Sequence, residues 1–132
     1  MSSNLHIGAI LHLYCSFTRP PKDKFLVIVC LDPKPLLVFI NSRINTLIQR
    51  NPDLAQCQIV IDAENHTFLD YDSYIDCSEV CSFQQDHLEE QAKSQFKGTV
   101  SSQVLSEIDA AIQKSPLIST RQLSWIAQAL KG

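Results

Sequence analysis

The sequence is short of glycine, and this shortage excludes the common nucleotide-binding loops. Only three glycines occur among the 132 residues, at Gly8, Gly98 and Gly132. A phosphate-cradling loop or a dinucleotide fingerprint needs two or three glycines within about eight residues, so neither can be built. A Gly-x-Ser-x-Gly motif is also missing, and the cysteines and histidines show no recognised protease spacing. We therefore expect no nucleotide cofactor, and no other cofactor is predicted.

Long apolar runs are missing as well. Hydrophobic residues make up 45% of the chain, yet no stretch reaches the roughly 20 apolar residues that a membrane-spanning helix needs. No Lys or Arg precedes the first apolar run, which His12 and Tyr14 interrupt, so this run does not have the pattern of a signal peptide. We therefore expect a soluble, cytoplasmic chain without a membrane partner.

The five cysteines form an odd set that does not suggest a disulfide framework. In a chain expected to stay inside the cell, we predict free thiols with mainly structural roles. Cys77 and Cys81 have a spacing that zinc sites tolerate. Cys57 or His66 would have to complete such a site, because no second pair of comparable spacing follows. We therefore predict no metal site.

Charge is distributed unevenly along the chain. Residues 1–50 contain six Lys or Arg and two Asp or Glu, residues 51–90 contain none and ten, and residues 91–132 contain five and two. The three segments thus carry net charges of +4, −10 and +3. A chain of this kind can present a basic face to an anion or a nucleic acid even though its net charge is negative. The alternative is that the basic residues only keep turns soluble.

Apolar patterns predict a β-rich first part, residues 5–82. Residues 6–15 alternate between apolar and polar side chains, as in a half-buried strand. Residues 25–30 are continuously apolar, which is typical of a strand buried on both faces at the centre of a sheet. Further strands are expected over residues 36–41, 57–62 and 72–77, and a basic loop with two prolines over residues 19–24. The connections are too short for helical crossovers, so the sheet should be antiparallel and strongly curved.

The second part, residues 84–131, has a helical period. Helices are predicted over residues 84–93, 99–115 and 119–131, with one or two further turns over residues 42–50 that Ser42 or Asn41 would cap. Ser119 and Gln122 have the spacing of a capping box, and Trp125 lies at the edge of the last apolar stripe. Residues 1–132 are therefore expected to form one α+β domain: a small curved antiparallel sheet or SH3-like barrel, followed by C-terminal helices.

The order of several features resembles the PemK/MazF-like toxins. Ile7-Gly8 opens the first strand, Lys24 directly precedes the apolar strand, the third strand ends at Asn41-Ser42, and Asp72-Ser73-Tyr74-Ile75 comes before a closing helix. The resemblance covers residues 7–115 as a pattern, without a specific signature, and residues 119–131 would be an addition to it. It implies an SH3-like barrel that cleaves single-stranded RNA without a metal, pairs with an antitoxin protein and forms a homodimer.

The resemblance also implies roles for particular residues. Cleavage by the 2′-hydroxyl of RNA requires a base, a cation for the developing charge and a proton donor to the leaving oxygen. Lys24 takes the position where the family usually has an arginine, and Ser42 takes that of its threonine. The further candidates are Arg19, which would reach in from the loop, His12 as an acid or base, and Lys22 and Arg43 as RNA-binding residues.

A second class of function stays open. A lysine cannot clamp phosphate with two parallel hydrogen bonds as an arginine does, so Lys24 also fits a non-catalytic SH3-like binding or regulatory module. The acidic segment, residues 51–90, fits this alternative, in which His12 would be a structural residue. If the chain is a nuclease, we expect Lys24, Arg19 and Ser42 to converge at one mouth of the sheet, covered by the loop of residues 19–24.

Overall fold

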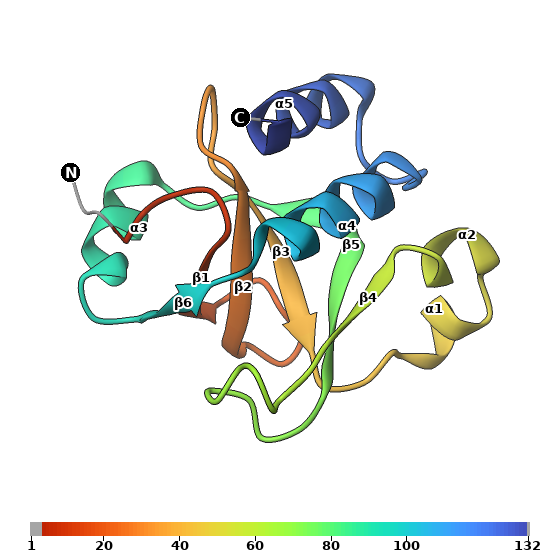
Figure 1. The fold of residues 1–132 in the computed structure, drawn as a ribbon, viewed down its shortest axis with the longest axis horizontal. Coiled ribbons are helices and arrows are strands. Elements are labelled where there is room, and N and C mark those ends of the chain that lie inside the picture. The colour runs from red at the N-terminus through yellow and green to blue at the C-terminus, as the bar shows by residue number, and fades with distance from the viewer. Residues whose placement is uncertain (1–3, 132) are drawn as a thin grey trace.

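The computed structural model describes residues 4–131, which form six strands and five helices (Figure 1). Residues 1–3 and 132, which the expected domain of residues 1–132 includes, lie outside the described part. The elements are β1 (Ala9–Cys15), β2 (Lys22–Cys30), β3 (Leu36–Asn41), α1 (Thr46–Gln49), α2 (Pro52–Ala55), β4 (Gln58–Ile61), β5 (Ser73–Cys81), α3 (Gln85–Ala92), β6 (Phe96–Thr99), α4 (Ser102–Gln113) and α5 (Thr120–Lys131).

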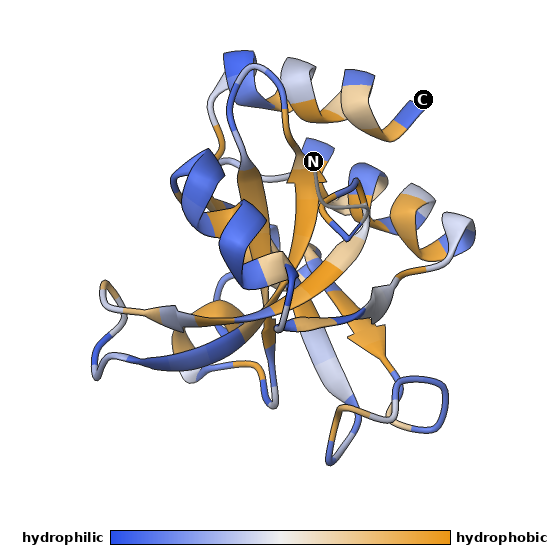
Figure 2. Ribbon diagram, turned by 90° about the vertical axis from the view of Figure 1, so that its left-hand side faces the viewer, coloured by the Kyte–Doolittle hydropathy of each residue, from blue (hydrophilic) through white to orange (hydrophobic). Residues whose placement is uncertain are grey.

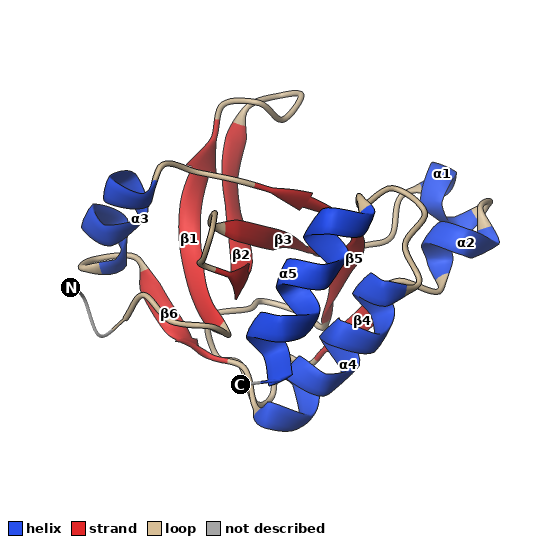
Figure 3. Cartoon of the chain, turned by 90° about the horizontal axis from the view of Figure 1, so that it is seen from above, coloured by secondary structure: helices blue, strands red, loops and turns tan. Residues whose placement is uncertain are grey.

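The strands form one sheet with the order β4-β5-β3-β2-β1-β6, and every pair of neighbours is antiparallel. Figure 3 shows that the strands curl into a half-barrel, with α4 and α5 lying along one side. The predicted α+β class, with a curved antiparallel sheet before C-terminal helices, is confirmed. β2 lies beside β3 at the middle of the order, as its continuous apolar run predicts.

Two cores lie on the two faces of the sheet, because alternate residues of each strand point to opposite sides. From β2, Val27 and Val29 enter the first core, which also contains Ile108 of α4 and Ile126 of α5. Leu26 and Ile28 enter the second core, which contains Leu88 and Ala92 of α3. Figure 2 shows the hydrophobic strands between helices whose outer sides are hydrophilic. Both faces of the sheet are therefore covered by packed side chains.

The helices begin and end where local capping chemistry directs them. Ser101 accepts a hydrogen bond from the amide of Val104 at the start of α4, at 3.2 Å. Ser119 accepts one from the amide of Gln122 at 3.2 Å before α5, as the capping-box spacing predicts. Trp125 is partly buried against the first core. None of the helices within residues 4–131 combines the length and the apolar character that crossing a bilayer requires.

Several element boundaries differ from the sequence predictions. β2 begins at Lys22 rather than at residue 25, and β5 continues to Cys81 rather than ending at residue 77. The helix expected over residues 99–115 begins at Ser102, because Phe96–Thr99 pairs with β1 as the edge strand β6. The helix expected over residues 42–50 covers only Thr46–Gln49, and its cap is Asn45 rather than Ser42 or Asn41. Pro52 begins the next helix, α2, where its missing N–H costs no hydrogen bond.

Candidate functional site

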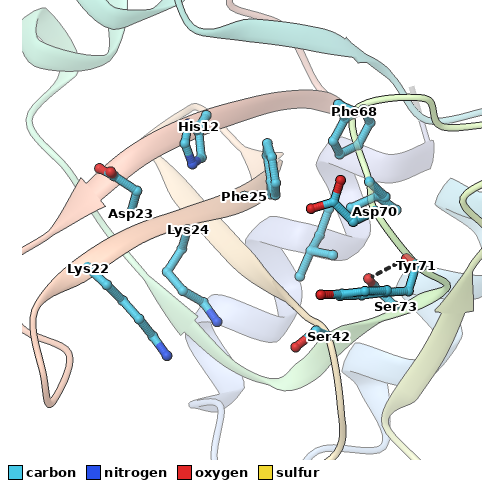
Figure 4. Close-up of a pocket in the computed structure, with 12 residues that line it drawn as sticks. His12, Lys22, Asp23, Lys24, Phe25, Ser42, Phe68, Asp70, Tyr71 and Ser73 are labelled. Carbon is cyan, nitrogen blue, oxygen red and sulfur yellow. Dashed lines mark hydrogen bonds between the residues drawn. The ribbon is translucent and has the colours of Figure 1, made fainter.

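A cleft of about 290 Å³ lies at the end of the sheet where β2 begins and β3 ends. The β4–β5 loop, residues 62–72, forms its opposite wall. Figure 4 shows the residues of this cleft, which come from β1, β2, the end of β3, that loop and the first residue of β5. The lining residues are His12, Lys22, Asp23, Lys24, Phe25, Ile40, Ser42, Phe68, Leu69, Asp70, Tyr71 and Ser73.

Lys24 is the best anchored cation of the cleft. Its side chain is partly buried, and its ammonium group donates a hydrogen bond to the amide oxygen of Asn41, the residue across from it on β3. The ammonium nitrogen also lies 5.6 Å from the centre of the Phe39 ring, within reach of a cation–π interaction. Burial, and then the charge of Lys22, lower the pKa of Lys24. The local structure therefore holds this ammonium in one place but makes its proton easier to lose.

Lys22 and Ser42 border the same cleft as Lys24. Lys22 is the exposed first residue of β2, two residues before Lys24, so the two side chains lie on one side of the strand. Ser42 follows the last residue of β3 and is exposed. Figure 4 shows the two lysines and the Ser42 hydroxyl around one opening, with the hydroxyl end of Tyr71 on its far side.

His12 lines the cleft from the other side of the sheet. It lies across from Phe25 in the register of β1 and β2, and the two rings stack with centroids 4.5 Å apart and an interplanar angle of 28°. Phe25 in turn contacts Phe68 of the β4–β5 loop at 4.9 Å. Phe25 and Lys24 are adjacent in β2 and point to opposite faces, so the His12 ring is separated from the Lys24 ammonium by the strand (Figure 4). This placement favours the structural role for His12.

Arg19 and Arg43 lie outside the cleft lining. Arg19 is exposed in the turn between β1 and β2, and Arg43 is exposed in the loop before α1. The expected convergence therefore holds for Lys24 and Ser42, whereas Arg19 is not among the described residues that line the cleft. The loop expected over residues 19–24 to cover the cleft is shorter in the structure, because β2 already begins at Lys22, which pairs with Cys15 of β1.

Sequence reasoning missed the contribution of the β4–β5 loop. Phe68, Leu69, Asp70 and Tyr71 line the cleft although no strand or helix contains them. The aromatic residues within this acidic loop were a weak signal, since loops between strands rarely need two of them. The loop adds the Asp70 carboxylate to a cleft in which β2 already places Lys22, Asp23 and Lys24, so the charge of the cleft is mixed rather than purely basic.

The cysteines do not form a metal site. Cys77 is buried in the first core, whereas Cys81 packs beside the second core on the opposite face of the sheet. Within residues 4–131, no group of three or more His, Cys, Asp or Glu side chains is placed to hold a metal ion. All five cysteines are free thiols, and burial is the main cause that raises their pKa values.

No protein-family model matches the chain, and no curated protein matches it either. The resemblance to the PemK/MazF-like toxins therefore stays a prediction from the sequence pattern.

Proposed function

We propose that the protein is a PemK/MazF-like endoribonuclease that cleaves single-stranded RNA without a metal and acts as the toxin of a toxin–antitoxin pair. One observation carries the proposal. Lys22 and Lys24 of β2 and Ser42, which follows β3, border one cleft at the end of the curled sheet. Two cations and a hydroxyl group at one opening suit a phosphate group.

The proposed reaction is an internal transesterification. The 2′-oxygen of the ribose bonds to the adjacent phosphorus, and the bond from phosphorus to the 5′-oxygen breaks. The products are a 2′,3′-cyclic phosphate and a 5′-hydroxyl end. Asp70 takes the proton of the 2′-hydroxyl in this proposal, because it faces the cleft from the loop (Figure 4). The departing 5′-oxygen takes a proton from water.

Lys24 stabilises the negative charge that builds up on the phosphate oxygens in this scheme. Asn41 fixes the Lys24 ammonium, so little reorganisation is needed when the charge develops. Lys22 adds a second charge that draws the RNA backbone to the cleft, and the Ser42 hydroxyl donates to a phosphate oxygen.

The second candidate is a non-catalytic SH3-like module that binds RNA or another anionic partner. The hydrogen bond from Lys24 to Asn41 favours this candidate. It uses one of the three N–H donors of the ammonium, and an ammonium, unlike a guanidinium, cannot clamp a phosphate with two parallel bonds. The two candidates share the cleft and differ only in whether the bound phosphate is attacked.

Cleavage of an end-labelled single-stranded RNA in excess EDTA tests the proposal. The wild type should produce fragments with 2′,3′-cyclic phosphate ends, and Lys24→Ala, Ser42→Ala and Asp70→Asn should each slow their formation. Lys114→Ala is the matched control, since Lys114 is an exposed lysine at the end of α4. Binding at low salt without cleavage would select the non-catalytic module, and neither cleavage nor binding would reject both candidates.

The partners follow from the same proposal. We expect an antitoxin protein that covers the cleft, a homodimer formed through the sheet, and a location in the cytoplasm. Co-expression with the product of a neighbouring gene should relieve growth arrest by the wild type. Light scattering of the purified chain should give twice the monomer mass of 14.9 kDa. A monomer at micromolar concentration would contradict the dimer.

A further inference from the structure

A second groove, which the proposed reaction does not use, opens on the face of the sheet that carries Lys24. Its volume is about 650 Å³, and it lies between the β1–β2 turn, the β2–β3 turn and the segment that joins β5 to α3. The lining residues are Ser16, Phe17, Pro33, Lys34, Pro35, Ser82, Phe83, Gln84 and Gln85. We call it the Phe17 groove.

A series of aromatic rings connects the Lys24 ammonium with the Phe17 groove. Lys24 lies over Phe39, whose ring centre is 6.0 Å from that of Phe17. Phe17 is 5.8 Å from Phe83, and Phe83 stacks on His87 with centroids 6.0 Å apart and an interplanar angle of 17°. The rings thus form a continuous path that begins at the proposed phosphate site and ends on α3.

The rings of this path are accessible to a ligand. The side chain of Phe17 is 51% exposed although its ring touches two other aromatic rings. Phe39 and Phe83 are partly exposed, and His87 is exposed. A phenylalanine needed only for the second core would be buried, as Leu26 and Leu37 are in the same core. The exposure therefore points to a ligand that covers the rings.

The charge of the surroundings selects among ligands. The described residues that line the Phe17 groove include one cation, Lys34, and no carboxylate. Lys24 and Lys22 stand at the other end of the ring path. The far end of the path lies on α3, which carries Asp86, Glu89 and Glu90, so the cations are those at the Lys24 end and Lys34 in the groove. Aromatic faces beside cations are the arrangement by which proteins hold single-stranded nucleic acid, with bases stacked on rings and phosphates near cations.

We propose that the Phe17 groove is a base-stacking subsite for single-stranded RNA, which holds nucleotides that continue from the scissile phosphate at Lys24. This proposal rests on the proposed function and extends it, because it predicts that several nucleotides beyond the cleavage site determine the affinity. Stacking accepts every base, so the subsite should bind strongly without a marked sequence preference.

Tryptophan placed at position 17 reports directly on stacking. In a Trp125→Phe background, Phe17→Trp and Phe83→Trp should each lose fluorescence when a non-cleavable 2′-deoxy or 2′-O-methyl oligonucleotide of about ten nucleotides is added, because a base stacks on the indole. Leu117→Trp is the matched control: Leu117 is 53% exposed, nearly the same as Phe17, and lies in the connection between α4 and α5. Its fluorescence should not change.

Affinity provides the second measurement. Phe17→Ala should weaken binding of the ten-nucleotide ligand about 5- to 100-fold, and the loss should be smaller for a ligand of about three nucleotides that reaches only the cleft. Leu117→Ala should leave both affinities unchanged. Circular dichroism and thermal melting identify variants that fail to fold. If Phe17→Ala does not fold, Phe17→Leu replaces it, because leucine keeps the apolar contact but has no flat face for stacking.

The outcomes separate this inference from the proposed function. If the wild type cleaves RNA but the two reporter tryptophans do not respond, and Phe17→Ala weakens the binding of both ligand lengths equally, the stacking subsite is wrong and the nuclease proposal stands. The same two results from a wild type that binds RNA without cleaving it would also reject the subsite, and would leave the non-catalytic module. If the wild type neither cleaves nor binds RNA, the proposed function fails and the inference fails with it. Quenching by a proline-rich peptide but not by RNA would overturn the inference in favour of a peptide groove.

Discussion

Replacing Lys24 by methionine tests the cation on which the proposed chemistry depends. Methionine keeps an unbranched apolar stem beside Phe39 but removes the charge. The loss of one preorganised electrostatic contact to a developing oxyanion typically lowers a rate about 10²- to 10³-fold. We therefore expect Lys24→Met to cleave single-stranded RNA roughly 100 to 1,000 times more slowly than the wild type.

The same substitution should hardly change the stability of the fold. The wild-type ammonium gains from its hydrogen bond to Asn41 and from the Phe39 ring, but its partial burial costs solvation free energy, which is why its pKa is lowered. These contributions oppose each other and solvent screens the charge, so the free energy of unfolding should change by less than about 1 kcal/mol. Thermal melting beside the cleavage assay separates a catalytic loss from an unfolded variant.

The pH dependence of cleavage gives a second test of Lys24. Because burial and Lys22 lower its pKa, the ammonium loses its proton at a lower pH than an ordinary lysine does. The rate should therefore fall on the alkaline side earlier than ordinary lysine titration predicts. Lys24→Arg should cleave at least as fast as the wild type, because a guanidinium can clamp phosphate with two bonds. It should also keep its rate at alkaline pH, because the guanidinium stays charged. Two results would refute this reasoning: a Lys24→Met variant that cleaves as fast as the wild type, or a Lys24→Arg variant whose cleavage rate falls at the same alkaline pH as that of the wild type.

Three further predictions concern the fold. Gly8→Ala should lower the free energy of unfolding by roughly 1–3 kcal/mol in denaturant titration, because Gly8 has φ +88° and an added Cβ would lie 3.3 Å from Leu105 and Val100; unchanged stability would contradict the strain argument. Ser115→Ala should lower the free energy of unfolding by about 1–2 kcal/mol, since the buried Ser115 hydroxyl donates to the Ser78 carbonyl at 2.5 Å. Ser119→Ala serves for comparison, because it removes only the exposed helix cap of α5. Burial raises the pKa of Cys77, so above about pH 9 the unfolded thiol ionises while the folded one stays protonated, and wild-type stability falls. The penalty of Cys77→Ala should therefore shrink by about 1.4 kcal/mol per pH unit, and a constant penalty would show that the thiol ionises equally in both states.

Local sequence patterns predicted most of the strands because each depends on its own side chains. The alternation of residues 6–15 and the apolar run of residues 25–30 correspond to β1 and most of β2. The strand β6 was missed because Phe96–Thr99 contains a lysine and a glycine and is a strand only through its pairing with β1. Propensity cannot indicate a pairing that the tertiary fold provides.

The candidate site was predicted in part, for the same reason. Lys24 and Ser42 end up together because β2 and β3 are adjacent in sequence and in the sheet. The β4–β5 loop reaches the cleft because β5, which follows it, pairs with β3 in a register that puts Tyr74 across from Asn41. This pairing joins segments about 30 residues apart, so no short pattern could place Asp70 or Tyr71 there. The separation of His12 from Lys24 depends on where β2 begins, and the expected start at residue 25 left Lys24 in a loop without a defined face.

The structure of the protein bound to a single-stranded RNA with a 2′-deoxy group at the cleavage site tests the central claim most directly. We expect one phosphate to lie within hydrogen-bond distance of both the Lys24 ammonium and the Ser42 hydroxyl, with the neighbouring ribose turned toward Asp70. An RNA that binds elsewhere, or a phosphate that lies out of hydrogen-bond reach of the Lys24 ammonium, would contradict it.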